Sequence, residues 1–181
     1  VSGILRESQY RLEIESLVSN RTNRTSTWSM AAYAALDKVV RRSPSVVNMS
    51  IGIPKCSAIS RTRRFVLGLG QQCYKTDSEF VDAFEAYTRI FDAPENQNIL
   101  FVAAAGNWDI DTRLSVLPAT LHLPNLITIG ATDLNDDRAT FIPLIGSKSN
   151  FGSDIEISSP GISVYAPKPD DYDPDFFGTS A

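Results

Sequence analysis

Ser180, within the segment Gly178-Thr179-Ser180-Ala181, and Asn107, which follows an apolar run, are the residues of this chain best suited to chemistry. A serine hydroxyl becomes a nucleophile when a neighbouring base takes its proton. At a helix N-terminus, unpaired backbone N–H groups can also stabilise an oxyanion. The Asn107 amide can donate a hydrogen bond to such an oxyanion. Taken alone, Gly-Thr-Ser is more often a loop with an N-cap serine, and Gly106-Asn107 is more often a turn.

Two segments at the ends of expected strands, Ser50-Ile51-Gly52 and Ala104-Ala105-Gly106, have the composition of a peptide-binding cleft. An extended peptide can add to a strand edge through backbone hydrogen bonds, and small residues on the facing wall leave room for its side chains. Gly52 would keep this cleft open for one side chain. The alternative is a pair of buried strands that end in glycine. The candidate substrate-contact residues are Ser50, Ile51, Gly52, Ala104, Ala105 and Gly106.

Length and composition indicate one soluble globular domain. The 181 residues are 43% hydrophobic and 21% charged, which is ordinary for this class. A net charge of −4 argues against a nucleic-acid partner. The longest apolar run, Ile99 to Ala105, is too short to span a membrane. No signal-peptide pattern opens the chain, and we expect that it begins inside a domain. Composition says nothing of the oligomeric state.

Apolar periodicity and helix-capping signals define a series of alternating elements. We expect helices over Trp28 to Arg42 and from a capping box at Thr76 to Pro94. The expected strands cover Leu12–Val18, Val46–Ser50, Ile99–Ala105, Leu126–Ala131, Asp154–Ser158 and Ile162–Ala166. This order predicts an α/β fold with a mostly parallel central sheet flanked by helices, in which Val46–Ser50 lies beside Ile99–Ala105. In such sheets, active residues gather at the carboxyl ends of strands.

Cys56 and Cys73 flank a segment, residues 53–75, that fits no regular element. A disulfide between them would suit a secreted protein, whereas two free thiols would suit a cytosolic one. Asn20 and Asn23 begin tandem glycosylation triplets, which also favour secretion. We predict that the two cysteines pair and that the protein is secreted or extracytoplasmic.

Five short segments, taken together and in order, resemble the subtilisin-like serine proteases, or subtilases. They are Ser50-Ile51-Gly52, Ala103-Ala104-Ala105-Gly106-Asn107, Ser149-Asn150-Phe151-Gly152, Ser159-Pro160-Gly161 and Gly178-Thr179-Ser180. The resemblance covers nearly the whole chain. It implies that Ser180 is the nucleophile and that Asn107 is the oxyanion-hole residue. It also implies that the two strand ends form the substrate cleft.

The other two residues of the family's catalytic triad have no counterpart here. The single histidine, His122, lacks the family's His-Gly-Thr motif and is predicted to be an ordinary surface residue. Asp109 and Asp111 lie on the wrong loop to replace the triad aspartate. Val1-Ser2-Gly3 resembles the sequence that follows the family's histidine motif, so we expect the triad histidine and aspartate to lie upstream of this chain.

The resulting expectation is a partial subtilase catalytic domain over residues 1–181 with a cleft-side insertion at 53–75. Its activity would be that of a serine endopeptidase acting on polypeptides through an acyl-enzyme. The alternative is a peptide-binding pseudoenzyme or fragment without a base. No cofactor is expected to be required and no metal ligands are predicted. Relatives often bind structural calcium, whose ligands we cannot place in this sequence.

Overall fold

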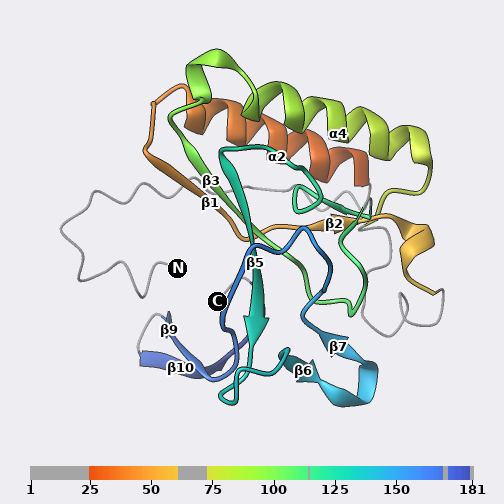
Figure 1. The fold of residues 1–181 in the computed structure, drawn as a ribbon, viewed down its shortest axis with the longest axis vertical. Helices are drawn as coiled ribbons and strands as arrows, with labels where there is room; N and C mark the ends of the chain where they lie inside the picture. Colours follow the sequence, from red (N-terminus) through yellow and green to blue (C-terminus); the bar gives the residue numbers. More distant parts are fainter. Residues whose placement is uncertain (1–24, 61–72, 114, 169–170, 180–181) are drawn as a thin grey trace.

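A computed structural model describes residues 25–60, 73–113, 115–168 and 171–179, with side chains for all of these except 25–31 and 165–176. The centre is a four-stranded parallel sheet in the order β1-β3-β5-β8 (Figure 1). These strands are β1 (Val46–Met49), β3 (Leu100–Ala104), β5 (Leu126–Thr132) and β8 (Ile157–Pro160). The predicted α/β fold and the pairing of β1 with β3 are therefore confirmed.

Three two-stranded antiparallel sheets surround the central sheet. They pair β2 (Ile53–Pro54) with β4 (Val116–Leu117), β6 (Thr140–Ile142) with β7 (Ser147–Lys148), and β9 (Val164–Lys168) with β10 (Asp171–Phe176). Short 3₁₀ turns cover Cys56–Ala58, Pro94–Asn96 and Pro143–Ile145. The predicted strands at 154–158 and 162–166 each lie a few residues further along the chain, and the predicted strand at 12–18 lies outside the described residues.

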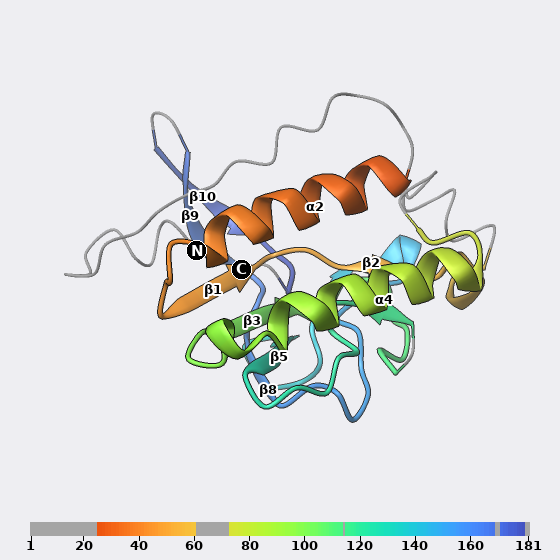
Figure 2. The ribbon, with the colours of Figure 1, turned by 90° about the horizontal axis from the view of Figure 1, so that it is seen from above.

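Two helices, α2 (Thr25–Val40) and α4 (Asp77–Phe91), lie side by side against the sheet (Figures 1 and 2). The capping box begins α4, because Thr76 Oγ1 accepts the Glu79 N–H at 3.1 Å and the Glu79 carboxylate accepts the Lys75 N–H at 2.7 Å. The Tyr33 hydroxyl of α2 donates to the Ala83 carbonyl of α4 at 3.0 Å. Neither helix, nor any other helix among the described residues, is long and apolar enough to cross a membrane.

The main core lies between the helices and the sheet. Side chains that alternate along β1 and β3 point toward α4, whose buried residues are Phe80, Ala83, Tyr87 and Phe91. Phe91 stacks on Phe101 of β3 with ring centroids 4.2 Å apart, and both side chains are fully buried. Burial raises the pKa of Tyr87, so its phenol stays neutral.

The residues 46–50 are predicted to form a short buried strand, but strand β1 is buried on one face only. Val47 and Met49 are buried, but Val46 and Asn48 are exposed. The strand has one neighbour, β3, among the described residues, and its other face is not covered there by a helix. An apolar residue such as Val46 fits a strand on either face, so apolar content alone does not establish double burial.

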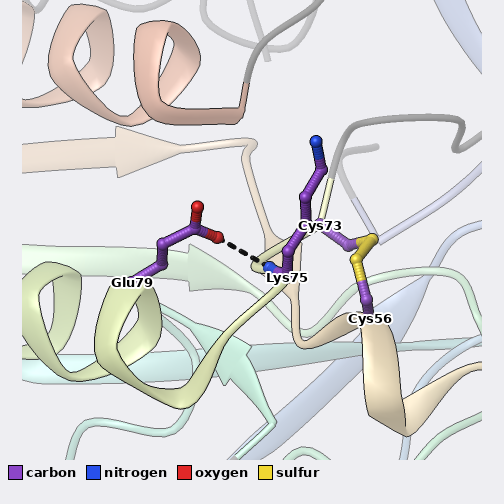
Figure 3. The surroundings of a disulfide bond; sticks show 4 residues. All are labelled: Cys56, Cys73, Lys75 and Glu79. Atoms are coloured by element: carbon purple, nitrogen blue, oxygen red, sulfur yellow. Dashed lines mark hydrogen bonds between the residues drawn. A yellow bond between two sulfur atoms is a disulfide. The ribbon is translucent and has the colours of Figure 1, made fainter.

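The segment 53–75 is more regular at its two ends than the sequence indicates. Ile53 and Pro54 pair with β4, and Lys55 forms a bridge with Tyr74. Cys56 and Cys73 form a disulfide with Cα atoms 5.0 Å apart, which confirms the predicted pairing (Figure 3). The disulfide, Ile59 and Tyr74 are buried, so the ends of this segment belong to the core.

Replacing Phe91 by alanine should remove a large part of the packing between α4 and the sheet. We expect the free energy of unfolding to fall by roughly 3–5 kcal/mol, because a buried ring is replaced by a cavity. Chemical denaturation monitored by circular dichroism measures this loss. Val81→Ala, on the same helix at a position that is 49% exposed, is the control and should cost less than about 1 kcal/mol. Equal losses in the two variants would contradict the packing described here.

Candidate active site

Asn107, just after β3, is held by Thr179 from the other end of the chain. The Thr179 N–H and hydroxyl both donate to Asn107 Oδ1, at 2.9 and 3.0 Å. The Gly106 N–H in turn donates to Thr179 Oγ1 at 3.0 Å. Because Oδ1 receives two donors, this oxygen faces Thr179 and the Nδ2 group is directed elsewhere as a donor. Ser180, the candidate nucleophile, lies outside the described residues.

Two glycines allow this close approach between distant segments. Gly106 has φ +99° and Gly178 has φ +126°, conformations that residues with side chains rarely adopt. A Cβ atom on Gly178 would lie 3.0 Å from Asn107 Nδ2. The Gly178 N–H donates to the Gly161 carbonyl at 2.9 Å. The Gly-Thr segment is therefore fixed between the carboxyl ends of β3 and β8.

Asn150 holds the loop that carries Asn107. Its Nδ2 group donates to the Ala105 carbonyl at 2.7 Å, and its Oδ1 atom accepts the N–H groups of Trp108 and Ile110 at 2.9 and 3.2 Å. The Asn150 N–H also donates to the Gly106 carbonyl at 2.8 Å. The side chain is 1% exposed. A single buried amide thus satisfies three backbone groups on both sides of Asn107.

The predicted cleft residues lie at neighbouring strand ends, as the strand order requires. Ser50 is exposed, and Ile51 and Gly52 are half-buried. The facing segment is less open than predicted, since Ala104, Ala105 and Gly106 are all buried. The space beside Gly52 is narrow as well, because a Cβ atom there would lie 3.3 Å from Val116 Cγ1 and 3.4 Å from Trp108 Cη2.

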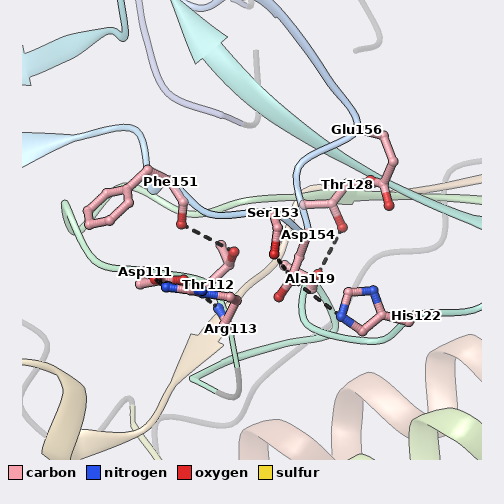
Figure 4. A network of polar contacts seen from close by, with 10 residues as sticks. All are labelled: Asp111, Thr112, Arg113, Ala119, His122, Thr128, Phe151, Ser153, Asp154 and Glu156. Atoms are coloured by element: carbon pink, nitrogen blue, oxygen red, sulfur yellow. Dashed lines mark hydrogen bonds and ion pairs between the residues drawn. The ribbon is translucent and has the colours of Figure 1, made fainter.

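His122 and Asp154 form a polar contact away from these strand ends, with His122 Nε2 3.2 Å from Asp154 Oδ1 (Figure 4). They lie shortly before β5 and β8, at the amino ends of the parallel strands, whereas Asn107 and Gly161 follow carboxyl ends. The imidazole is 68% exposed, which agrees with the predicted surface position. Nothing in the sequence indicates its partner Asp154, whose side chain is 1% exposed. His122 therefore lies at the opposite edge of the sheet from Asn107 and Gly161.

The two aspartates after Asn107 are also paired elsewhere. Asp109 lies 2.7 Å from Arg138, and Asp111 accepts two hydrogen bonds from Arg113 Nε, at 2.8 and 3.0 Å. The hydrogen bonds from Arg113 lower the pKa of the Asp111 carboxyl. Across the described part of the chain, no three His, Cys, Asp or Glu side chains gather as a metal site.

Sequence reasoning missed three residues that shape this site, namely Thr179, Asn150 and Trp108. Thr179 and Asn150 lie within two of the segments that resemble the subtilases, Gly178-Thr179-Ser180 and Ser149-Asn150-Phe151-Gly152. That position in a motif is the one feature of the sequence that indicates a role for them. Trp108 follows Asn107 directly, but nothing in its sequence context indicates that its ring lies beside Gly52.

Asn150→Ala should destabilise the protein by roughly 2–4 kcal/mol, because it leaves several buried backbone groups without partners. Thermal or chemical unfolding measures the loss. Asn135→Ala, in an exposed turn, provides a matched control and should change stability by less than about 0.5 kcal/mol. An Asn150→Ala protein as stable as the control would show that the loop after β3 does not depend on this amide.

Comparison with known proteins places this geometry in a family. The sequence matches the Subtilase family (peptidase S8) over residues 12–180. It is 37% identical over 83 residues to Subtilisin-like protease 3 of Pseudogymnoascus destructans, covering 46% of this chain and 18% of that protein. It is 33% identical over 82 residues to Subtilisin DY of Bacillus licheniformis, covering 45% of this chain and 27% of that protein.

Solved structures agree at the level of the fold. A lanthipeptide protease superposes with a TM-score of 0.55 at 20% identity, covering 84% of this chain and 47% of the other. A cold-adapted subtilisin-like serine proteinase gives a TM-score of 0.50 at 24% identity, covering 84% of this chain and 42% of the other. The chain thus spans less than half the length of these relatives. With the family match extending from residue 12 to the candidate nucleophile, this chain belongs to the Subtilase family.

Proposed function

We propose that this chain is the part of a serine endopeptidase that contains the nucleophilic serine, and that the enzyme cleaves polypeptides through an acyl-enzyme intermediate. Ser180 is the nucleophile and Asn107 Nδ2 is an oxyanion donor. The observation that carries the proposal is the orientation of the Asn107 amide. Two hydrogen bonds from Thr179 occupy Oδ1, which leaves Nδ2 to donate beside Gly178, two residues before Ser180.

The reaction follows from these roles. Ser180 Oγ attacks the carbonyl carbon of the scissile peptide bond while a base takes the hydroxyl proton. The carbonyl oxygen becomes negative and receives the hydrogen bond from Asn107 Nδ2. The C–N bond then breaks, and the amine leaves with the proton from the base. Water hydrolyses the resulting ester by the same steps, which returns Ser180 to its hydroxyl form.

The base and the aspartate that orients it belong, in this proposal, to sequence outside these 181 residues. The only histidine of the chain is His122, whose imidazole pairs with Asp154 at the amino ends of the strands. A pseudoenzyme that binds peptides without cleaving them is the second candidate, and a complete polypeptide without a base would favour it. The buried Cys56–Cys73 disulfide supports secretion, since such bonds persist in oxidising compartments.

The proposed endopeptidase activity is tested by assaying the complete polypeptide and its Ser180→Ala variant for peptide cleavage. We expect serine-dependent hydrolysis of a peptide substrate by the complete protein and no appreciable turnover by the 181-residue chain alone. An inert complete protein that still binds peptides would favour the pseudoenzyme. Robust cleavage by the isolated chain would show that it contains a base that we have not identified.

Asn107→Ala should lower kcat of the complete protein by roughly 10²–10³, the usual effect of removing one oxyanion donor. KM should change little, because this hydrogen bond is strongest in the transition state. Steady-state kinetics on one peptide substrate separate the two constants. A variant whose kcat is unchanged would exclude Asn107 as the donor.

Thr179 has a separate, positioning role that a conservative pair of variants can test. Thr179→Val removes the hydroxyl that bridges the Gly106 N–H and Asn107 Oδ1, and we expect kcat to fall about tenfold. Thr179→Ser keeps the hydroxyl and should stay close to the parent. If both variants have the same kcat, the hydroxyl does not orient Asn107.

A further inference from the structure

The six-membered ring of Trp108 lies between the two glycines of the predicted cleft. A Cβ atom on Gly52 would lie 3.4 Å from Trp108 Cη2 and 3.5 Å from Cζ3. A Cβ atom on Gly106 would lie 2.5 Å from Cζ3 and 2.8 Å from Cε3. The same ring edge therefore occupies the position that a Cβ atom on Gly106 would need, and it lies at ordinary contact distance from the Cβ position of Gly52, where Val116 Cγ1 is nearest at 3.3 Å. The missing side chain of Gly106 makes the room that the indole fills, and the indole edge faces Gly52 across an ordinary contact distance.

The indole is held in this position from behind and through its backbone. It packs on a second buried cluster, composed of Ile59, Ile110, Val116 and Ala119. Ile59 lies close to the disulfide-bonded Cys56, so the segment 53–75 contributes to this support. The Trp108 N–H is bound by Asn150 at 2.9 Å. The aliphatic cluster and the backbone hydrogen bond together restrict the movement of the indole.

A substrate bound as proposed would bring one side chain to this place. Its reacting carbonyl oxygen lies at Asn107 Nδ2, and the Cβ atom of that same residue is only two bonds from the carbonyl carbon. Gly106 and Trp108 flank Asn107 directly in sequence, so this side chain begins beside them. In the described structure, ring carbons of Trp108 occupy the Cβ position of Gly106 and lie 3.4–3.5 Å from the Cβ position of Gly52.

We propose that Trp108 closes the side-chain pocket between Gly52 and Gly106 and restricts cleavage to peptide bonds that follow small residues, glycine or alanine. This specificity rests on the proposed endopeptidase function. Trp108 acts by excluding volume, since a leucine or phenylalanine side chain would have to displace a ring packed on the Ile59–Ile110–Val116–Ala119 cluster. Removing the indole should open the pocket without touching the groups that react.

The test compares fluorogenic peptides that differ in one residue, the one whose carbonyl is attacked, carrying glycine, alanine, leucine or phenylalanine. For the complete protein we expect kcat/KM for alanine to exceed that for phenylalanine by about tenfold or more, the usual discrimination of a pocket by side-chain size. In Trp108→Ala, kcat/KM for phenylalanine should rise at least tenfold, with Trp108→Phe between the two. Val81→Ala, on α4, is the control and should keep the parent preference.

Two outcomes would overturn the proposal. One is a parent protein that prefers leucine or phenylalanine, and the other is a Trp108→Ala protein, folded by circular dichroism, whose preference is unchanged. If no protein cleaves any peptide, the endopeptidase proposal fails, and calorimetric binding of peptide acids ending in alanine or phenylalanine decides the pocket separately. Tighter binding of the alanine peptide, reversed in Trp108→Ala, would support a closed pocket, and equal binding of both would refute it.

Discussion

Asn150 is the residue on which the geometry of the candidate site depends. The chain after β3 must leave the sheet, and its backbone groups lose the partners that a strand would give them. A buried amide with one donor and one acceptor atom replaces these partners at Ala105, Trp108 and Ile110. The loop is then held on both sides of Asn107. This support allows an irregular segment to present a side chain in one orientation.

Thr179 completes the arrangement from the opposite direction. Asn150 fixes the backbone on either side of Asn107, and Thr179 fixes the rotation of the Asn107 side chain. Both interactions use polar groups that are wholly or partly buried, where an unsatisfied partner is costly and a satisfied one defines a single conformation. The subtilase match and the hydrogen bonds thus describe the same part of the chain, the first by its sequence and the second by its geometry.

Much of the fold could be predicted from sequence because its signals are local. The box at Thr76 and Glu79, the apolar face of α4 and the apolar run at β3 each lie within one element. The contacts of the site are not local in this sense. Asn150 and Ala105 are 45 residues apart, and His122 and Asp154 belong to different loops. The type of a residue does not indicate which distant residues it will contact. The sequence therefore identifies Asn150 only as part of a motif.

The glycines show how one residue type supports two interpretations. Gly52 and Gly106 each indicate a place where a side chain would be in the way, and the sequence suggests that the space belongs to a substrate. The structure shows the indole of Trp108 in that space at Gly106, with its edge at contact distance from the Cβ position of Gly52. An aromatic ring packed on an aliphatic cluster and a substrate side chain make the same steric demand on a glycine. The sequence alone therefore identifies the space and leaves its occupant undetermined.

The hydrogen bond between the Thr179 N–H and Asn107 Oδ1 joins residues that are 72 positions apart. This separation affects the order in which the structure can form. A ribosome releases β1, α4, β3 and β5 first, and their pairing closes shorter loops at a lower cost in chain entropy. The Asn107 amide has no Thr179 to orient it until almost the whole described chain has been made. The parallel sheet can thus assemble during synthesis while the Asn107 side chain still rotates, and the arrangement around Asn107 becomes unique only after Gly178 and Thr179 have been made.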